Sequence, residues 1–277
     1  MEQHIYFHIP KAGGSTLNSI ITREYSKHNV YKIHSDFTFD DFLKLKKTHR
    51  ENIKLFGGII KFGVHKFLGL ETKYFCIIRD PVSRIVSLYN YIQLDKAEGL
   101  YKKIPYEHRK DIKSFVENLD KNHTTLQGHN GQSRLLSGKE ILDESWDKNL
   151  ESPKIADNAM GDVAIENIIN HFAFIGTLEY FEESLVLMKK YLNWKKPLFY
   201  IRRNVTQKRE NNISEEVLNL IKEKNSEDMK LYQYVNDKLH QQINYHWDYI
   251  RNEKRKLKFN SDLYKFYRKY IRNIIKS

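Results

Sequence analysis

The clearest pattern in the chain is a short apolar run, a glycine turn and an amphipathic stretch near the N-terminus. Residues 5–9 are mostly apolar and predict a buried strand, which Pro10 ends. The pair Gly13-Gly14 allows a tight turn of the backbone. Apolar positions then recur with helical spacing over residues 17–25, so a helix should open at Ser15-Thr16.

This order of elements is typical of an anion-binding turn. Backbone N–H groups converge at the N-terminus of a helix, and the helix dipole favours negative charge there. The alternative is an ordinary strand-to-helix turn with a solvated lysine. A Walker A loop fits poorly, because its lysine follows the glycines. The candidate anion ligands are Lys11, Gly13, Gly14, Ser15 and Thr16.

A second apolar run, residues 73–78, predicts another buried strand, and a helix over 82–92 follows Pro81. Strands alternating with helices indicate an α/β protein. We therefore expect a P-loop-like three-layer fold with a central, mostly parallel sheet flanked by helices. Further strands are expected at 30–33 and 172–176, and residues 55–64 are apolar and interrupted by glycines. Further helices are expected near 112–119, 163–169, 181–192, 214–224 and 226–243.

Open parallel sheets bind ligands at the carboxyl ends of their strands, and Arg79 follows the second apolar run there. Arg79 and Ser87 are candidates to grip a second phosphate, arginine through a bidentate fork. Helical spacing suggests that Arg84 and Ser87 serve one surface together. Alternatively, Asp80 caps a helix and the arginines form structural salt bridges.

Composition limits the choice of partner and compartment. The chain has 277 residues and a net charge of +12, which indicates an acidic partner such as a nucleotide, a glycan, nucleic acid or a membrane surface. A single cysteine, Cys76, argues for a reducing compartment. The chain shows neither a signal-like segment nor the roughly 18–20 consecutive apolar residues of a membrane span. We expect a cytoplasmic protein, or a catalytic domain cut from a longer one.

The segments HIPKAGGST and CIIRDPVSRIVSLY together resemble the carbohydrate sulfotransferases related to heparan sulfate 2-O- and 6-O-sulfotransferases. GQSRLLSG and FAFIGTLEYFEESLVLM also look like segments of that family. Ala12 stands where the family often has threonine. The resemblance covers most of residues 1–245, which we expect to form a sulfotransferase domain.

The resemblance implies that 3′-phosphoadenosine 5′-phosphosulfate (PAPS) donates a sulfuryl group to a carbohydrate hydroxyl by in-line displacement, with no metal. The first motif would hold the 5′-phosphosulfate, and Arg79 and Ser87 the 3′-phosphate. Lys11 would stabilise the leaving phosphate. Gln132 and Arg134 match a Gln-x-Arg element that could touch the acceptor, or else form a helix cap with a structural arginine. Lys208 and Arg209 lie where such enzymes close a loop over the nucleotide, or else in a solvated basic loop.

The reaction needs a base for the hydroxyl proton, and twelve histidines compete for that role. His65 is the first candidate, because the family's catalytic histidine lies between the corresponding segments. His34 is the alternative, because IHSDF resembles a His-x-Asp-aromatic stretch of the 6-O branch. His8 is expected to be a packed histidine of the first strand.

Two other classes of function remain open at this stage. A P-loop kinase would transfer phosphate rather than sulfuryl groups. A non-catalytic module would bind polyanions without turnover. We expect a carbohydrate acceptor, which can itself be anionic, and no specific nucleic-acid partner.

The C-terminal segment, residues 246–277, is expected to be a basic amphipathic helical extension. Ten basic and two acidic residues lie between Arg251 and Ser277, so eight of the twelve net positive charges are there. Apolar residues fall with helical spacing over 263–274, after a cap at Ser261 or Asp262. This helix packs its apolar face on the domain, or docks to an anionic membrane surface or to the acceptor.

Overall fold

The computed structural model describes residues 3–33, 39–60, 62–68, 71–94, 102–121, 128–139, 154–202 and 213–271. Its described strands form one five-stranded sheet in the order β2-β3-β1-β4-β5, and all four pairings are parallel. The strands are β1 (Gln3–Phe7), β2 (Val30–Ile33), β3 (Leu55–Gly58), β4 (Thr72–Ile78) and β5 (Phe172–Thr177). The expected α/β fold with a central parallel sheet flanked by helices is confirmed.

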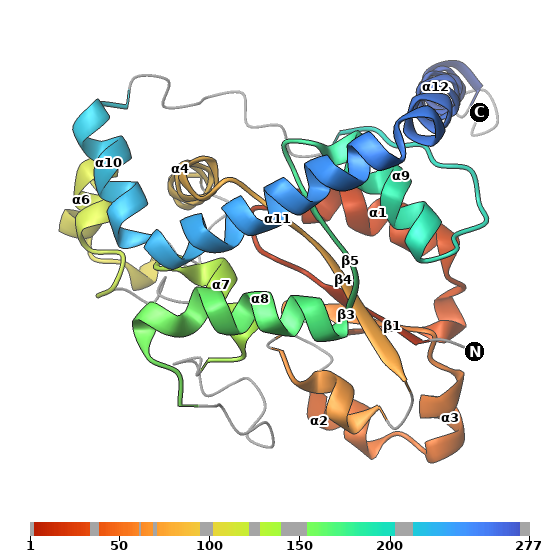
Figure 1. Ribbon diagram of the computed structural model, residues 1–277, viewed down its shortest axis with the longest axis horizontal. Coiled ribbons are helices and arrows are strands. Elements are labelled where there is room, and N and C mark those ends of the chain that lie inside the picture. The colour runs from red at the N-terminus through yellow and green to blue at the C-terminus, as the bar shows by residue number, and fades with distance from the viewer. Residues whose placement is uncertain are drawn as a thin grey trace.

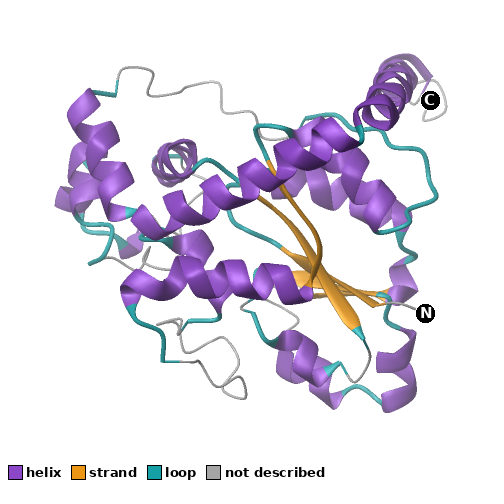
Figure 2. Ribbon diagram, in the orientation of Figure 1, coloured by secondary structure: helices purple, strands orange, loops and turns teal. Residues whose placement is uncertain are grey.

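Helices lie on both sides of this sheet (Figures 1 and 2). The described α-helices are α1 (Gly14–Glu24), α2 (Phe39–Lys44), α3 (Lys47–Asn52), α4 (Pro81–Ile92), α6 (Ile112–Glu117), α7 (Gly131–Ser137), α8 (Met160–His171), α9 (Phe181–Tyr191), α10 (Glu215–Lys224), α11 (Ser226–Tyr245) and α12 (Trp247–Phe266). The pattern-based ranges match most of these elements to within a few residues.

The strand order creates a crevice at the carboxyl ends of β1 and β4. From β1 the chain passes through α1 to β2 on one side, whereas from β4 it passes through α4 and later helices to β5 on the other. Neighbouring parallel strands whose connections leave in opposite directions open a gap outside their carboxyl ends, and α/β proteins bind ligands in that gap. We call this side of the sheet the carboxyl edge.

Two apolar clusters hold the layers together. On one face, Phe7 and Tyr74 pack with side chains of α2, α7, α8 and the first half of α11. On the other face, Tyr6 and Phe75 pack with α1, α9, α12 and the second half of α11. Alternate residues of β1 and β4 therefore serve opposite faces, as a strand buried on both sides requires. Helix α11 contributes to both clusters and contacts β5, so it covers that edge strand.

A third, smaller cluster joins α4, α6 and α10, with Phe115, Leu88 and Ile221 at its centre. It lies beside the sheet rather than over it (Figure 1). Because α4 also starts directly after β4, this cluster fixes the helix that leaves the carboxyl edge.

The N-termini of three helices share one buried polar network. The Asp228 carboxylate, on the first turn of α11, accepts hydrogen bonds from the backbone N–H groups of Gln132 (3.2 Å) and Ser133 (2.7 Å) in α7. Glu227 accepts one from Gly161 of α8 at 2.7 Å. In return, the Asn130 side chain accepts the backbone N–H groups of Glu227 and Asp228, each at 3.1 Å. These bonds satisfy amides that helices leave unpaired at their N-termini.

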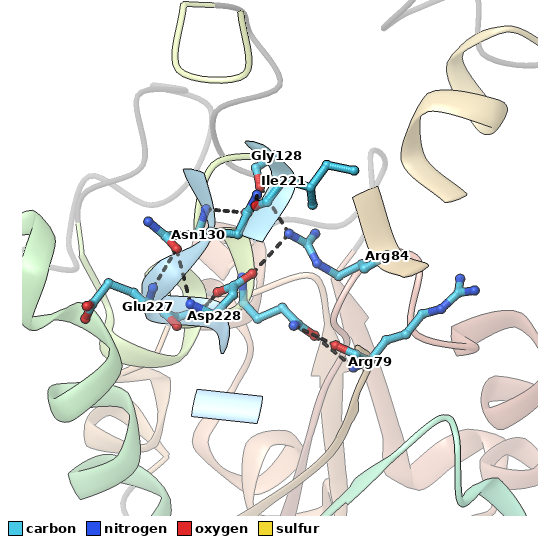
Figure 3. Close-up of polar contacts among 10 residues, drawn as sticks. Arg79, Arg84, Gly128, Asn130, Ile221, Glu227 and Asp228 are labelled. Atoms are coloured by element: carbon cyan, nitrogen blue, oxygen red, sulfur yellow. Dashed lines mark hydrogen bonds and ion pairs between the residues drawn. The ribbon is translucent and has the colours of Figure 1, made fainter. Parts of the chain in front are cut away.

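Asp228 also pairs with Arg84 of α4, at 3.2 Å between Nη2 and Oδ2, and both side chains are almost fully buried (Figure 3). The same guanidinium donates to the Gly128 carbonyl at 3.2 Å. Arg84 is therefore a structural residue, and the expectation that it serves a surface together with Ser87 is wrong.

The C-terminal helix differs from its predicted range. It starts at Trp247 rather than after a cap at Ser261 or Asp262, and it continues as a π-helical turn over Tyr267–Ile271. Ser261 lies inside the helix, is buried, and accepts the backbone N–H of Tyr200 at 3.1 Å. That long-range hydrogen bond explains a serine which sequence alone assigns to a cap. The division at residue 245 stays a prediction.

We expect Asp228→Asn to destabilise the fold strongly. The change leaves the buried Arg84 guanidinium without a counter-charge, and breaking one partner of a buried ion pair costs about 3–5 kcal/mol. Urea denaturation measures the difference in the free energy of unfolding. Asp237→Asn, an exposed position on the same helix, is the control and should change stability by less than about 0.5 kcal/mol. Equal effects of the two variants would contradict a central role for this pair.

Candidate functional site

The turn between β1 and α1 is built from two left-handed residues. Lys11 has a φ of 68° and Gly13 a φ of 79°, and Gly13 forms the N-cap of α1. Its carbonyl accepts the backbone N–H groups of Thr16 and Leu17. A non-glycine residue at positive φ is unfavourable, so surrounding contacts must hold Lys11 in this conformation. The turn places the start of α1 at the carboxyl edge.

Both glycines of the turn are required by close neighbours. A Cβ atom at Gly13 would lie 2.7 Å from Leu178 Cδ1, just after β5. A Cβ atom at Gly14 would lie only 1.9 Å from His8 Nε2. The side chains of the residues that directly follow β1 and β5 therefore fill the space next to the turn, and only glycine lets α1 begin so close to the sheet.

The Lys11 side chain contacts the ring of Tyr91 and lies near the positive charge of Arg79. Its ammonium is 3.9 Å from the centroid of the Tyr91 ring, at the end of α4. Burial, together with the nearby charge of Arg79, lowers the pKa of Lys11 to about 8. A lysine with this pKa is still mostly protonated at neutral pH, and it can neutralise an anion at the turn.

Arg79 connects the two sequence motifs. Its Nη1 donates to the backbone carbonyl of Lys11 at 3.2 Å, although the residues are 68 positions apart. The backbone of Arg79 is held in turn by Gln132, whose Oε1 accepts its N–H and whose Nε2 donates to its carbonyl, both at 2.9 Å. The structure therefore brings Lys11 and Arg79 together at the crevice between β1 and β4.

The side chain of Arg79 points away from the buried Arg84–Asp228 pair (Figure 3). Ser87 is half-buried on α4 and lies one turn before Tyr91, on the same side of the helix. Because the Tyr91 ring contacts the Lys11 ammonium, Ser87 lies on the face of α4 that borders the turn. Ser15 is exposed in the first turn of α1, and Thr16 is buried.

Gln132 and Arg134 lie in α7 and are both buried. Gln132 is fully enclosed, and both ends of its amide bind the backbone of Arg79, so it positions that residue rather than presenting a free amide to an acceptor. Arg134 is 7% exposed, and burial lowers its pKa while Asp157 and Asp228 oppose the shift.

His65 does not join Lys11 and Arg79. Its Nδ1 lies 2.8 Å from the Tyr74 hydroxyl, and its ring centroid lies 4.6 Å from that of His171. Tyr74 is near the amino end of β4, five residues before Arg79, which corresponds to roughly 15 Å along the strand. Burial, with the charges of His171 and Lys66, lowers the pKa of His65 to about 4. His65 therefore lies toward the amino end of the sheet, and its role as the base stays a prediction.

Two other basic side chains, His8 and Lys32, lie near the carboxyl edge. His8 stacks on Tyr6, and burial together with Lys32 lowers its pKa to about 4. Lys32, on β2, donates to Asn18 of α1 at 3.4 Å. A lysine next to the end of a short strand was the available sequence signal for a third cation near the turn, besides Lys11 and Arg79.

Glu179 follows β5 and contacts the residue after Arg79. Its carboxylate accepts the backbone N–H of Asp80 and the hydroxyl of Tyr232, each at 3.2 Å. Burial raises its pKa, and Asp80 adds to the shift. The sequence places Glu179 in a family-like segment, yet nothing in that segment alone indicates these two partners.

Three predicted residues, His34, Lys208 and Arg209, lie outside the described residues. Within the described part of the chain, no three His, Cys, Asp or Glu side chains group as metal ligands do.

A comparison with protein families matches residues 3–264 to the galactose-3-O-sulfotransferase family. A search of curated proteins finds no match. The match spans both motifs, the glutamine that holds Arg79, and most of α12. The expected membership of a carbohydrate sulfotransferase family is confirmed.

The match corrects the predicted compartment. The family consists of Golgi-type sulfotransferases, which are membrane-anchored enzymes of the lumen, so the expectation of a cytoplasmic protein is wrong. Among the described helices, none is long and apolar enough to cross a membrane. With nearly its whole described length matched, the chain belongs to the galactose-3-O-sulfotransferase family.

Proposed function

We propose that this protein transfers the sulfuryl group of PAPS to a carbohydrate hydroxyl by in-line displacement. The observation that carries the proposal is the contact between the two motifs, in which Arg79 Nη1 lies 3.2 Å from the Lys11 carbonyl. A single nucleotide with phosphate groups at both ends of its ribose fits two cationic sites this close. The 5′-phosphosulfate would lie against the amides of α1, and the 3′-phosphate against Arg79 and Ser87.

Within this proposal each group at the crevice has a chemical task. The leaving phosphate gains negative charge as the sulfur–oxygen bond breaks, and the Lys11 ammonium with the first amides of α1 stabilises that charge. Gly13 and Gly14 let these oxygens approach the backbone. Gln132 keeps the Arg79 backbone in place, which holds the donor in line with the attacking hydroxyl.

The family supports galactose as the sugar that accepts sulfate, at its 3-hydroxyl. The same membership disfavours a P-loop kinase and a non-catalytic polyanion-binding module, since the family is one of sulfotransferases.

The proposed proton acceptor follows from the position of the strands. A base must lie within hydrogen-bond reach of the hydroxyl, and His65 lies toward the amino end of β4. In the sequence, His34 comes directly after Ile33, the last residue of β2, whose carboxyl end belongs to the same edge as the turn. We therefore assign the base to His34, the alternative that the sequence offered.

The first prediction concerns the donor. Adenosine 3′,5′-bisphosphate should bind about 10- to 150-fold more tightly than AMP, because one charge-assisted contact contributes about 1.5–3 kcal/mol. Arg79→Met should remove most of this preference in isothermal titration calorimetry. Lys73→Met, near the amino end of the same strand, is the matched control and should keep it. Equal affinities of the unchanged protein for the two nucleotides would overturn the assignment of Arg79.

The second prediction uses the pKa of Lys11, which is about 8. The folded protein loses this positive charge as the pH rises through 8. The affinity for adenosine 3′,5′-bisphosphate should therefore fall between pH 7 and pH 9.5, by at most about tenfold per pH unit. Lys11→Arg keeps its charge and should bind with little change over that range. Calorimetry at several pH values tests this, and a flat profile for the unchanged protein would exclude Lys11 as the phosphate ligand.

The third prediction distinguishes the two histidines. His34→Ala should lower turnover by about 10²–10⁴-fold, the usual contribution of a general base, with bisphosphate affinity preserved. His65→Ala should leave turnover within a few-fold of the unchanged protein. A radiolabelled-sulfate assay with galactosides measures both variants. If His65→Ala loses turnover and His34→Ala does not, the base is His65.

A further inference from the structure

Helix α12 is attached to the domain along one side only. Ile250, Leu257 and Ser261 are buried, and the first two join the apolar cluster around α1 and α9. The ring of Tyr264 lies 4.7 Å from that of Phe199, and Lys254 forms an ion pair with Glu183 of α9. These residues recur every three to four positions, so they mark one face of the helix.

The opposite side of the same helix carries an apolar stripe that faces solvent. Phe259, Leu263, Phe266 and Tyr270 are 69%, 58%, 55% and 49% exposed. Their spacing of four, three and four residues puts them in one row, and the rings of Phe266 and Tyr270 are 4.9 Å apart. On a soluble surface, one large exposed apolar side chain is ordinary, but a contiguous row of four indicates an interaction site.

Cations lie beside this stripe. Arg255, one turn before Phe259, and Lys269, next to Tyr270, are exposed on its flank. Lys258, Lys265 and Arg268 are exposed elsewhere around the helix and the turn that follows it. Lys265 pairs with Asp262 at 3.0 Å, and the Lys269 ammonium lies 5.0 Å from the Tyr270 ring. An exposed apolar row with basic residues beside it is the arrangement of helices that lie in the interface of an anionic membrane.

The helix is accessible for such contact. It lies at the margin of the molecule, next to the described end of the chain and far from α6 and α10 (Figure 1). The buried side holds α12 to α9, while the stripe points away from that attachment. A flat surface can therefore approach the stripe without displacing the helix.

We propose that α12 docks this protein on an anionic lipid surface, with the Phe259–Tyr270 stripe in the interfacial region and the bordering cations at the headgroups. A polyanionic sugar would engage the cations but leave the apolar row in water. A second copy packed stripe to stripe would bring the two sets of cations together, and juxtaposed like charges are costly. A lipid surface uses both features at once. This proposal does not depend on the donor or on the acceptor.

Sedimentation of the full chain with vesicles tests the proposal. The protein should bind phosphatidylcholine vesicles that contain phosphatidylserine, bind pure phosphatidylcholine vesicles much more weakly, and be released by salt. The triple variant F259S/L263S/F266S should lower the partition coefficient by on the order of 100-fold, because three apolar side chains leave the interface. The thermal midpoint and bisphosphate affinity should be unchanged, because the three side chains face solvent.

Ile169→Ser, an equally exposed apolar position on α8, is the control and should bind vesicles like the unchanged protein. Failure of the unchanged protein to sediment with anionic vesicles would overturn the proposal. So would full vesicle binding by the triple variant, which would leave only a charge effect. A dimer in light scattering without vesicles that the triple variant abolishes would identify a second copy as the occupant.

Discussion

The carboxylate of Asp228 is the constraint on which the arrangement of helices depends. It neutralises the buried Arg84 of α4 and accepts two backbone N–H groups at the start of α7, while belonging to the first turn of α11. Three helices from distant parts of the chain thus share one anion. A buried ion pair contributes little net stability, but each of its polar atoms needs a partner, and this requirement leaves few alternative arrangements of these helices.

The same network reaches the proposed donor site. Fixing the start of α7 fixes Gln132, which binds both backbone groups of Arg79, and Arg79 donates to the carbonyl of Lys11. Arg79 is therefore held by Gln132 of the core, and its guanidinium in turn binds the backbone of Lys11. This explains how Lys11 and Arg79 stay close although their charges repel. Burial is the main cause of the lowered pKa of Lys11, and the charge of Arg79 adds to it.

Local signals predicted the fold and the two motifs, whereas long-range contacts decided what remained. The strand, glycine turn and helix around Gly13 are determined by residues adjacent in sequence, and so is the helix after Pro81. No local signal shows that Arg84 meets Asp228, that Gln132 binds a backbone 53 residues away, or that Ser261 bonds to Tyr200. The location of His65 could not be predicted for the same reason, since position in the sequence does not reveal which end of the sheet a segment reaches.

Lys11 is held in an unfavourable backbone conformation at the turn between β1 and α1. The left-handed backbone of Lys11 and the neighbouring cation Arg79 are unfavourable. The contact of its ammonium with the Tyr91 ring is only weakly favourable. Such a conformation persists only when the rest of the structure enforces it. Here Arg79 binds the Lys11 carbonyl, and Gln132 holds Arg79 in place. The phosphosulfate of the proposed donor would find the cations and amides of this turn already in place. It would then gain charge stabilisation without first ordering the groups that provide it.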